Sequence, residues 1–345
     1  MPVAVTLTAG LTAWLDPFFH YHAPLSGFYY MLDNERAQND GITKRFSYQA
    51  LITGTSLTQN FKTSELEALF GVQAVKVCYA GSPMKETADN LRVALATHEV
   101  KMVVRDLYEE MLLWDKDRLL DSAGEYPVWL YNDNPFDDVR YLLNMDVLVD
   151  YCAPMLVKKI SGMPGGIMTF DDYSRWMSDN VELGKRVVLQ KAGPLSNGVE
   201  QTPLTDEEKN VLKENLRQNA GEPAARYPDT MFYYFFPPYS VASWGKAFTS
   251  GEALRRLEVQ ELTIKELLPY DNIKLFAFGI NTGITEDFDN YRDPEHYTDR
   301  INSMILEEMA NPDSVYRITA ENANAYLGEM KRIYLTYDYE SLWKE

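Results

Sequence analysis

Five apolar runs of strand length alternate with helix-like segments along most of this 345-residue chain, and this order constrains the fold more than any other feature. The runs cover residues 50–53, 72–80, 101–108, 231–238 and 272–279. Such continuous apolar runs are typical of parallel strands that helices cover on both faces. The sequence therefore predicts an α/β fold, a three-layer α/β/α sandwich around a five-stranded, mostly parallel sheet.

Two of the intervening segments carry clear helix signals. Residues 84–99 follow Ser82 and Pro83, which predicts a serine N-cap with proline at the first helical position. Residues 251–268 place leucines at near-helical spacing and end before Pro269. Both segments are long enough to cross over between parallel strands.

An insertion of residues 109–229 separates the third and fourth expected strands and is too long for a simple crossover. Residues 136–160 predict one or two helices interrupted at Pro154, and Thr205 with Glu208 predicts a capping box. We expect the insertion to form a cap beside the functional site of an α/β domain that spans residues 25–345, and the alternative is a long surface excursion. Residues 312–345 are expected to be a C-terminal extension of that domain.

The first 24 residues differ from the rest of the chain. Residues 3–15 are apolar and uncharged but fall short of the roughly 20 residues that span a bilayer, and residues 16–24 are rich in aromatic side chains. We interpret residues 1–24 as the remnant of an N-terminal membrane anchor followed by an interfacial aromatic segment, which predicts the extracytoplasmic face of the cell membrane. The alternative is a first strand or helix of the soluble core.

Composition excludes several classes of function. The formal net charge is -18, and no basic run offsets it, so nucleic acid is not an expected partner. Cys78 and Cys152 are expected to be buried thiols. His20 and His22 are too few for a metal site without further ligands. We therefore expect neither a metal nor a cofactor.

In an open parallel sheet, ligands bind beyond the carboxyl ends of the strands, so the loops that follow the strands are the candidate site. The chemically interesting residues in these loops are Gly54, Thr55, Ser56, Gly81, Ser82, Tyr239, Ser240, Asp293 and His296. A serine, a histidine and an aspartate thus reach one sheet edge. This combination predicts a serine nucleophile with the imidazole as general base and the carboxylate as its orienting group.

Three short blocks resemble the SGNH (GDSL-type) hydrolase superfamily: "ITGTS" after the first strand, a glycine after the second, and "DPEH" ahead of a helix. The order of elements over about residues 48–311 is similar as well. The chain more closely resembles bacterial, membrane-tethered SGNH-like proteins of cell-envelope polysaccharide modification. The resemblance implies a flavodoxin-like sheet, Ser56 as nucleophile, Asp293 and His296 as its partners, and a Gly81 backbone N–H in the oxyanion hole.

The family's third block supplies an asparagine after the third strand, where this chain has Arg105 and Asp106. The expected oxyanion donors are then the backbone N–H groups of Ser56 and Gly81. Thr55, which directly precedes Ser56, is also expected among the oxyanion and substrate-binding residues. Tyr239 and Ser240 are expected, by their position, to shape an acyl or sugar pocket.

The resemblance implies a serine esterase or O-acyltransferase that works through an acyl-enzyme on ester-linked acyl groups, with acylated carbohydrate of the cell envelope as substrate. A membrane-bound acyltransferase is an implied partner. The alternative is a catalytically silent member that binds envelope glycan or such a partner. A third alternative is a flavodoxin-like domain that binds a phosphorylated ligand. It would need a glycine-rich phosphate loop, which this sequence lacks.

Overall fold

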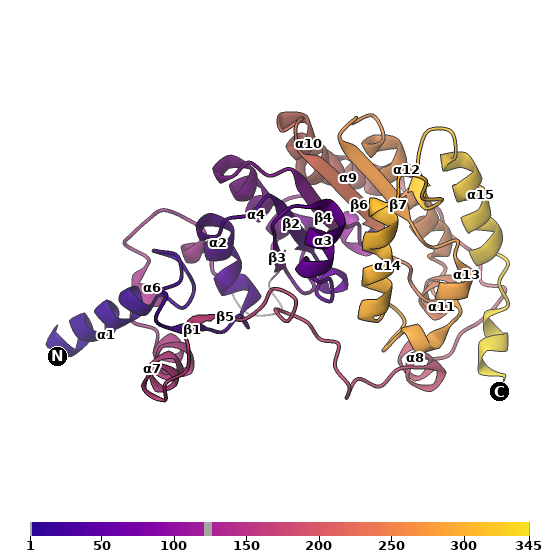
Figure 1. Ribbon diagram of the computed structural model, residues 1–345. Helices are drawn as coiled ribbons and strands as arrows, with labels where there is room; N and C mark the ends of the chain where they lie inside the picture. The colour runs from indigo at the N-terminus through magenta and orange to yellow at the C-terminus, as the bar shows by residue number, and fades with distance from the viewer. Residues whose placement is uncertain (1, 121–125, 345) are drawn as a thin grey trace.

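The structure is a computed structural model that describes residues 2–120 and 126–344 (Figure 1). Its central sheet has the strand order β3-β2-β4-β6-β7-β8. The strands are β2 (Ala50–Gly54), β3 (Ala74–Cys78), β4 (Met102–Asp106), β6 (Met231–Phe236), β7 (Ile273–Ala277) and β8 (Arg317–Ile318). The first five strands pair in parallel, and β8 pairs with β7 in the antiparallel direction.

The predicted α/β class with a mostly parallel sheet is confirmed, but the predicted number of five strands is wrong. The sixth strand, β8, lies in the C-terminal extension and is only two residues long. A two-residue strand leaves no alternation or apolar run that a sequence pattern can detect. The five expected strands are all present; β2 extends one residue beyond its apolar run, and the other four are shorter than theirs.

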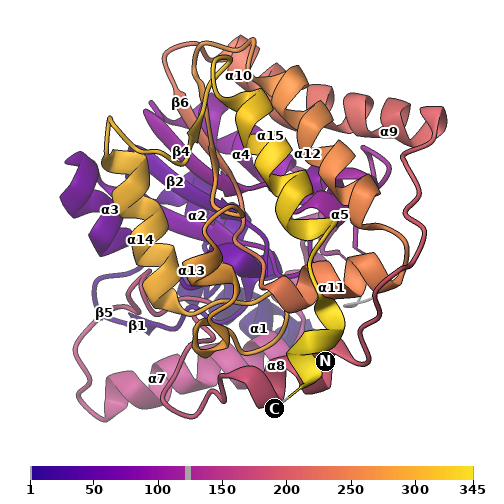
Figure 2. The same ribbon diagram turned by 90° about the vertical axis from the view of Figure 1, so that its right-hand side faces the viewer.

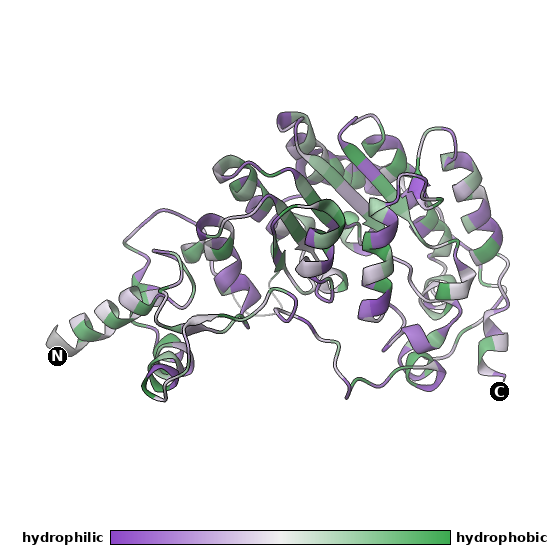
Figure 3. Cartoon of the chain, in the orientation of Figure 1, coloured by the Kyte–Doolittle hydropathy of each residue, from purple (hydrophilic) through white to green (hydrophobic). Residues whose placement is uncertain are grey.

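Helices cover both faces of the sheet. α3 (Thr63–Phe70) and α14 (Asp299–Ala310) lie together on one face, and α4 (Met84–Thr97) and α12 (Ala253–Leu267) lie on the other, as Figure 2 shows. Every residue of β2, β3 and β4 is buried, which explains their continuous apolar character. Figure 3 shows this hydrophobic centre as green strands between helices that carry purple outer faces.

The remaining elements complete the layers and connect them. They are α2 (Glu35–Arg45), η1 (Ser56–Thr58), α5 (Glu109–Leu112), η2 (Val128–Leu130), α8 (Lys185–Ala192), α9 (Asp206–Leu216), η4 (Arg217–Gly221), α10 (Glu222–Arg226), α11 (Val241–Thr249), α13 (Thr282–Thr285), η5 (Phe288–Asn290), α15 (Ala323–Tyr334) and η6 (Tyr339–Trp343). The capping box at the start of α9 is confirmed, because Thr205 and Glu208 each accept a hydrogen bond from the other's backbone N–H.

Two helix details differ from the sequence prediction. α4 begins at Met84 with Pro83, not Ser82, at the N-cap position, because the N–H of Ser82 closes a turn onto the carbonyl of Tyr79. Pro154 does not break its helix. A π-helix, η3 (Val147–Cys152), runs directly into α7 (Ala153–Ile160), and Pro154 is the second residue of α7. The wider π-helical turn before it accommodates the proline within a continuous helix.

The N-terminal segment and part of the insertion form a lobe at one end of the molecule (Figure 1). The lobe contains α1 (Pro2–Leu15), α6 (Val139–Leu142), η3, α7 and a small parallel sheet of β1 (Tyr29–Tyr30) and β5 (Gly166–Ile167). Phe18 and Phe19 are buried in it against protein, so these two aromatic side chains do not face outward as an interfacial segment requires. The Asp16 carboxylate binds the turn that follows α1 by accepting from the backbone N–H groups of residues 20–22.

The same lobe carries most of the large apolar side chains that are exposed. They are Val5, Leu7, Trp14, Phe136, Val139, Met145, Val149, Val157, Ile160 and Met163. None of the helices within residues 2–120 and 126–344 combines the length and the hydropathy that a membrane span requires.

Candidate active site

The turn after β2 presents Ser56 at the sheet edge. Gly54 has φ of +134°, and a Cβ there would collide with Oδ1 of Asp106, so only glycine fits. Thr55 then caps the short helix η1, and Ser56 begins that helix with its side chain partly exposed. The sharp backbone turn therefore places the serine hydroxyl at the carboxyl end of the strand.

The buried carboxylate of Asp106 stabilises this turn through hydrogen bonds from Thr55. Asp106, at the end of β4, accepts from the backbone N–H of Thr55 at 2.9 Å and from its hydroxyl at 2.5 Å. Burial raises the pKa of Asp106, and the two bonds from Thr55 oppose that shift. Because both donors of Thr55 are turned to Asp106, the structure places Thr55 as a support of the turn and not on the substrate side.

Ser56, His296 and Asp293 lie together. Oγ of Ser56 is 2.8 Å from Nε2 of His296, and Nδ1 of His296 is 3.0 Å and 2.9 Å from the two carboxylate oxygens of Asp293. A carboxylate can only accept at Nδ1, so the proton belongs there and Nε2 is free to accept from the serine hydroxyl. The imidazole is thus oriented as a base toward Ser56.

Residues 293–296 form a loop, here called the histidine loop, whose own contacts keep the Asp293 carboxylate ionised. Oδ1 of Asp293 also accepts from the backbone N–H groups of Glu295 and His296. Burial raises the pKa of Asp293, but the His296 side chain and these two N–H groups outweigh burial and lower the pKa to about 2. Asp293 is therefore negatively charged across the neutral range.

Tyr239 and Ser240 lie behind the site, and neither side chain is exposed where it could contact a ligand directly. Both residues are fully buried. The hydroxyl and the backbone N–H of Ser240 both donate to the carbonyl of Pro294, at 2.7 Å and 3.2 Å. The physical reason is the Pro237-Pro238 turn after β6, which directs the chain inward under the histidine loop, where the hydroxyl of Tyr291 holds the carbonyl of Pro238. Ser240 therefore supports the loop that carries the imidazole.

Gly81 lies in the loop after β3, with φ of +64° and open space where a Cβ would stand. Two residues at the start of α2 hold this loop. Glu35 accepts from the backbone N–H of Ala80 at 2.7 Å, and Arg36 donates to the carbonyl of Ala80 at 3.0 Å. Sequence reasoning missed both residues, because a Glu-Arg pair at a helix start is an ordinary surface pattern and nothing in it points to a loop 45 positions away.

Arg105 and Asp106, which stand where the resemblance implies an oxyanion asparagine, have other roles. The Arg105 guanidinium is buried on the far side of β4 and donates to the carbonyls of Met84 and Asn219 and to the hydroxyl of Thr87. Asp106 binds Thr55, as described above. Neither side chain reproduces the asparagine amide.

Trp176 is a further residue that sequence reasoning missed. It comes from the insertion, and its indole N–H donates to the carbonyl of Ser56 at 3.3 Å. Its ring meets the His296 ring edge-on at 5.8 Å between centroids, and the guanidinium of Arg292 lies 4.8 Å from its ring centre. This part of the insertion lies beside the site, whereas α9 of the same insertion packs against α12.

The other two histidines that we considered as ligands have protein partners. Nε2 of His20 is 3.1 Å from Oδ1 of Asp138, and the ring of His22 bonds the carbonyls of Trp14 and Ala23. Within the ranges that the structure describes, no group of three or more His, Cys, Asp and Glu side chains could hold a metal ion.

No family model matches this chain, and no curated protein matches it significantly. One solved structure that aligns with it is a protein from Streptococcus pneumonia that is provisionally described as a platelet activating factor. The alignment covers 95% of this chain and 99% of that chain, with 11% sequence identity and a TM-score of 0.38. A similarity at this level says nothing about the function of this chain.

Proposed function

We propose that this chain is a serine esterase or O-acyltransferase of the SGNH hydrolase type, with a flavodoxin-like core. The observation that supports it is the hydrogen-bonded series of Ser56, His296 and Asp293, with 2.8 Å between the hydroxyl and the imidazole. A nucleophile, a base and an orienting carboxylate within hydrogen-bond reach are the requirement for an activated serine.

In the proposed reaction, Oγ of Ser56 attacks the ester carbonyl while Nε2 of His296 takes its proton. The tetrahedral intermediate collapses when His296 returns that proton to the leaving alcohol, which gives an acyl-serine. A second hydroxyl group, deprotonated by His296, then attacks the acyl carbon and releases Ser56. Water as this second nucleophile gives hydrolysis, and a sugar hydroxyl gives transfer. The chemistry needs no cofactor.

The negative charge of the intermediate would be held by the backbone N–H groups of Ser56 and Gly81. The third donor of the family is missing, and a single oxyanion donor is worth ~3 to 4 kcal/mol of transition-state stabilisation. We therefore expect a slow enzyme. Glu35 and Arg36 gain importance under this proposal, because they hold the loop that presents one of the two remaining donors.

Acyl groups on cell-envelope polysaccharide are the proposed substrate class, and a membrane-bound acyltransferase is a proposed partner. The proposed location is the extracytoplasmic face of the membrane through an N-terminal anchor. The exposed apolar side chains of α1, such as Leu7 and Trp14, and of the helix that ends at Ile160 support attachment through this lobe, since an aqueous surface does not favour so many large apolar groups together.

A second candidate is a catalytically silent member that binds glycan or a partner through the same edge of the sheet. It is favoured by one observation: Arg105 and Asp106 serve internal contacts where the family places its oxyanion asparagine.

Labelling with a fluorophosphonate probe separates the two candidates. We expect a covalent adduct on Ser56 in the wild type, and its loss in Ser56→Ala and His296→Ala. Ser161→Ala and His98→Ala are matched controls that should label like the wild type, because both residues lie in other parts of the fold. Folded wild-type protein that takes up no probe and does not hydrolyse a short-chain aryl acetate would establish the silent binder.

A further inference from the structure

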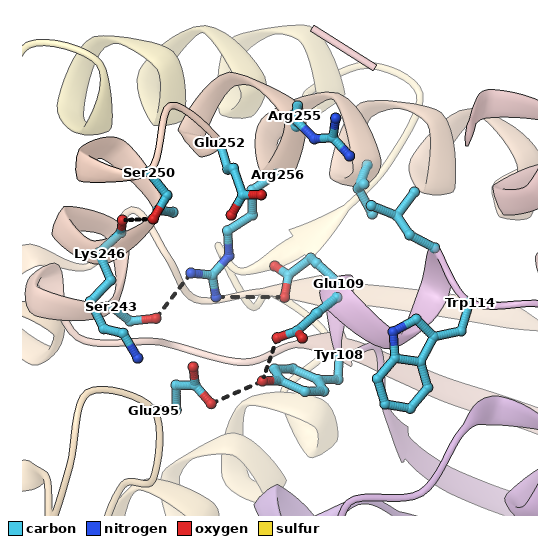
Figure 4. A pocket seen from close by; sticks show the side chains of 14 residues that line it. Tyr108, Glu109, Trp114, Ser243, Lys246, Ser250, Glu252, Arg255, Arg256 and Glu295 are labelled. Atoms are coloured by element: carbon cyan, nitrogen blue, oxygen red, sulfur yellow. Dashed lines mark hydrogen bonds and ion pairs between the residues drawn. The ribbon is translucent and has the colours of Figure 1, made fainter. Parts of the chain in front are cut away.

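A pocket of about 430 Å³ opens next to the histidine loop, between α5, α11 and α12 (Figure 4). Its volume falls in the range of small-molecule sites. Glu295 lines this pocket and directly precedes His296, and the hydroxyl of Tyr108, which also lines it, lies 2.9 Å from the carboxylate of Glu295. The pocket thus borders the loop that carries the imidazole.

A rigid carboxylate forms part of the pocket wall. Glu109 is 2% exposed, and its Oε1 accepts from the side-chain amide of Gln260 at 2.6 Å, which in turn accepts from the hydroxyl of Tyr326. Oε2 of Glu109 is buried without a hydrogen bond of ordinary length in the described part of the chain, and the guanidinium of Arg256 and the hydroxyl of Tyr239 lie near the carboxylate. The carboxylate therefore holds Arg256 at the pocket wall.

A rigid guanidinium faces this oxygen, as Figure 4 shows. The Arg256 side chain lies 4.0 Å from the ring centre of Tyr239 and 4.4 Å from that of Trp244, and it donates to the hydroxyl of Ser243 at 3.0 Å. Its other nitrogen is 3.7 Å from Oε2 of Glu109, beyond hydrogen-bond length. A hydroxyl oxygen does not fit between groups this close, so a ligand can bond only to the part of the guanidinium that lines the pocket.

The charges of the lining disfavour three other ligand classes. An anion would be repelled by the carboxylates of Glu109, Glu110, Glu252 and Glu295. A cation would be repelled by Arg256, Lys246 and Arg255. An alkyl chain would leave the polar wall without partners. A neutral ligand with several hydroxyl groups can bond to both kinds of side chain.

Trp114 supplies an apolar surface in the same pocket. Its ring is held by the guanidinium of Arg118, 4.0 Å from its centre, and it lines the pocket together with Leu113 and Val259. The C–H face of a sugar ring or polyol chain can pack on such a surface while its hydroxyl groups reach the charged side chains.

We propose that this pocket binds a neutral polyhydroxylated ligand, a sugar or polyol, with its hydroxyl groups bonded to charged side chains of the lining such as Arg256 and Glu252 and its C–H face on Trp114. The pocket is the acceptor subsite of the transfer reaction, and this role rests on the proposed function. The binding itself does not, because none of its groups belongs to the triad.

The test is a saturation-transfer difference NMR titration of the full-length Ser56→Ala protein, so that turnover plays no part. The probe is methyl α-D-glucopyranoside, with cyclohexanol and tetramethylammonium as comparisons of ring size and charge. We expect saturable binding of the glucoside alone. Trp114→Ala should weaken it at least tenfold, and Trp114→Tyr should restore most of it. Trp343→Ala, an exposed tryptophan in η6, is the matched control.

Glu109→Gln tests the polar wall, and Trp114→Ala, at a partly exposed position, carries the test if the buried variant fails to fold. Three outcomes overturn the proposal: no saturable binding of the glucoside, binding of tetramethylammonium or cyclohexanol in its place, or unchanged glucoside binding in Trp114→Ala. Failure of the esterase proposal looks different, since it is a wild-type protein that takes up no fluorophosphonate.

Discussion

Oγ of Ser56 lies 2.8 Å from Nε2 of His296, although 240 positions separate the two residues in the chain. The contact joins the end of β2 to the loop after β7, with β4 and β6 between these strands in the sheet. It therefore depends on the correct pairing of four neighbouring strands and on the supports beneath both loops. These supports can be tested one by one.

Asp293→Asn should lower kcat for an aryl acetate by roughly 10² to 10⁴. The amide cannot stabilise the imidazolium, and it can direct the wrong imidazole nitrogen toward Ser56. The measurement is steady-state hydrolysis together with the rate of fluorophosphonate labelling, with Asp313→Asn as a surface control. Equal rates in Asp293→Asn and the wild type would show that the carboxylate does not orient His296.

The same carboxylate should make stability depend on pH in a defined window. The pKa of Asp293 is lowered from its ordinary value to about 2, so the unfolded chain binds the proton first as the pH falls. The stabilisation is fully present above about pH 4 and is lost as the pH falls toward 2. Urea unfolding should give the wild type an advantage over Asp293→Asn of ~1 to 2 kcal/mol at pH 6 that shrinks in this window. An advantage that stays constant down to pH 2 would contradict the lowered pKa.

Under the proposed function, Glu35→Ala should lower kcat about tenfold or more with little change in KM, because the loop that would present the Gly81 N–H loses its contact to Ala80. Glu35→Gln should recover part of the rate, since its amide oxygen can still accept from the Ala80 N–H. A merely structural role would instead lower the melting temperature and leave the kcat of the folded protein intact. Glu65→Gln serves as the control, since Glu65 is a partly exposed residue in the first turn of α3 whose carboxylate pairs with Lys62.

Ser240→Ala should destabilise the protein by about 1 to 3 kcal/mol. The change removes the hydroxyl that donates to the Pro294 carbonyl and that also caps α11 by accepting from the N–H of Ser243. Chemical denaturation measures the loss, and Ser250→Ala at the exposed end of α11 is the matched control. If Ser240→Ala and Ser250→Ala unfold at the same denaturant concentration, the histidine loop does not need this hydrogen bond.

The parallel strands were predictable because both of their faces are buried, which forces continuous apolar runs such as residues 231–236. A second rule predicted that Ser56, Asp293 and His296 lie at one edge of the sheet, because the carboxyl ends of parallel strands meet at the same edge. β8 was not predictable, because its two residues pair only at the edge of a sheet that other strands have already formed.

The supports of the site were less accessible to sequence reasoning. Tyr239 and Ser240 follow a strand, as substrate-contacting residues do, but the Pro237-Pro238 turn directs them under the histidine loop. Trp176 and Glu35 reach the site through tertiary contacts of the insertion and of α2, and neither has a spacing that marks it. A loop's position in the sheet could be inferred, but the direction of its side chains could not.

The long separation of Ser56 from His296 also has a consequence during synthesis. A ribosome that adds roughly 5 to 20 residues per second needs about 12 to 48 s to extend the chain across the 240 positions between them. Throughout this interval the growing polypeptide carries a serine with no imidazole to deprotonate it. Under the proposed function, the reactivity of Ser56 is then acquired late, and a product that stalls before His296 carries a serine that no histidine of this loop activates.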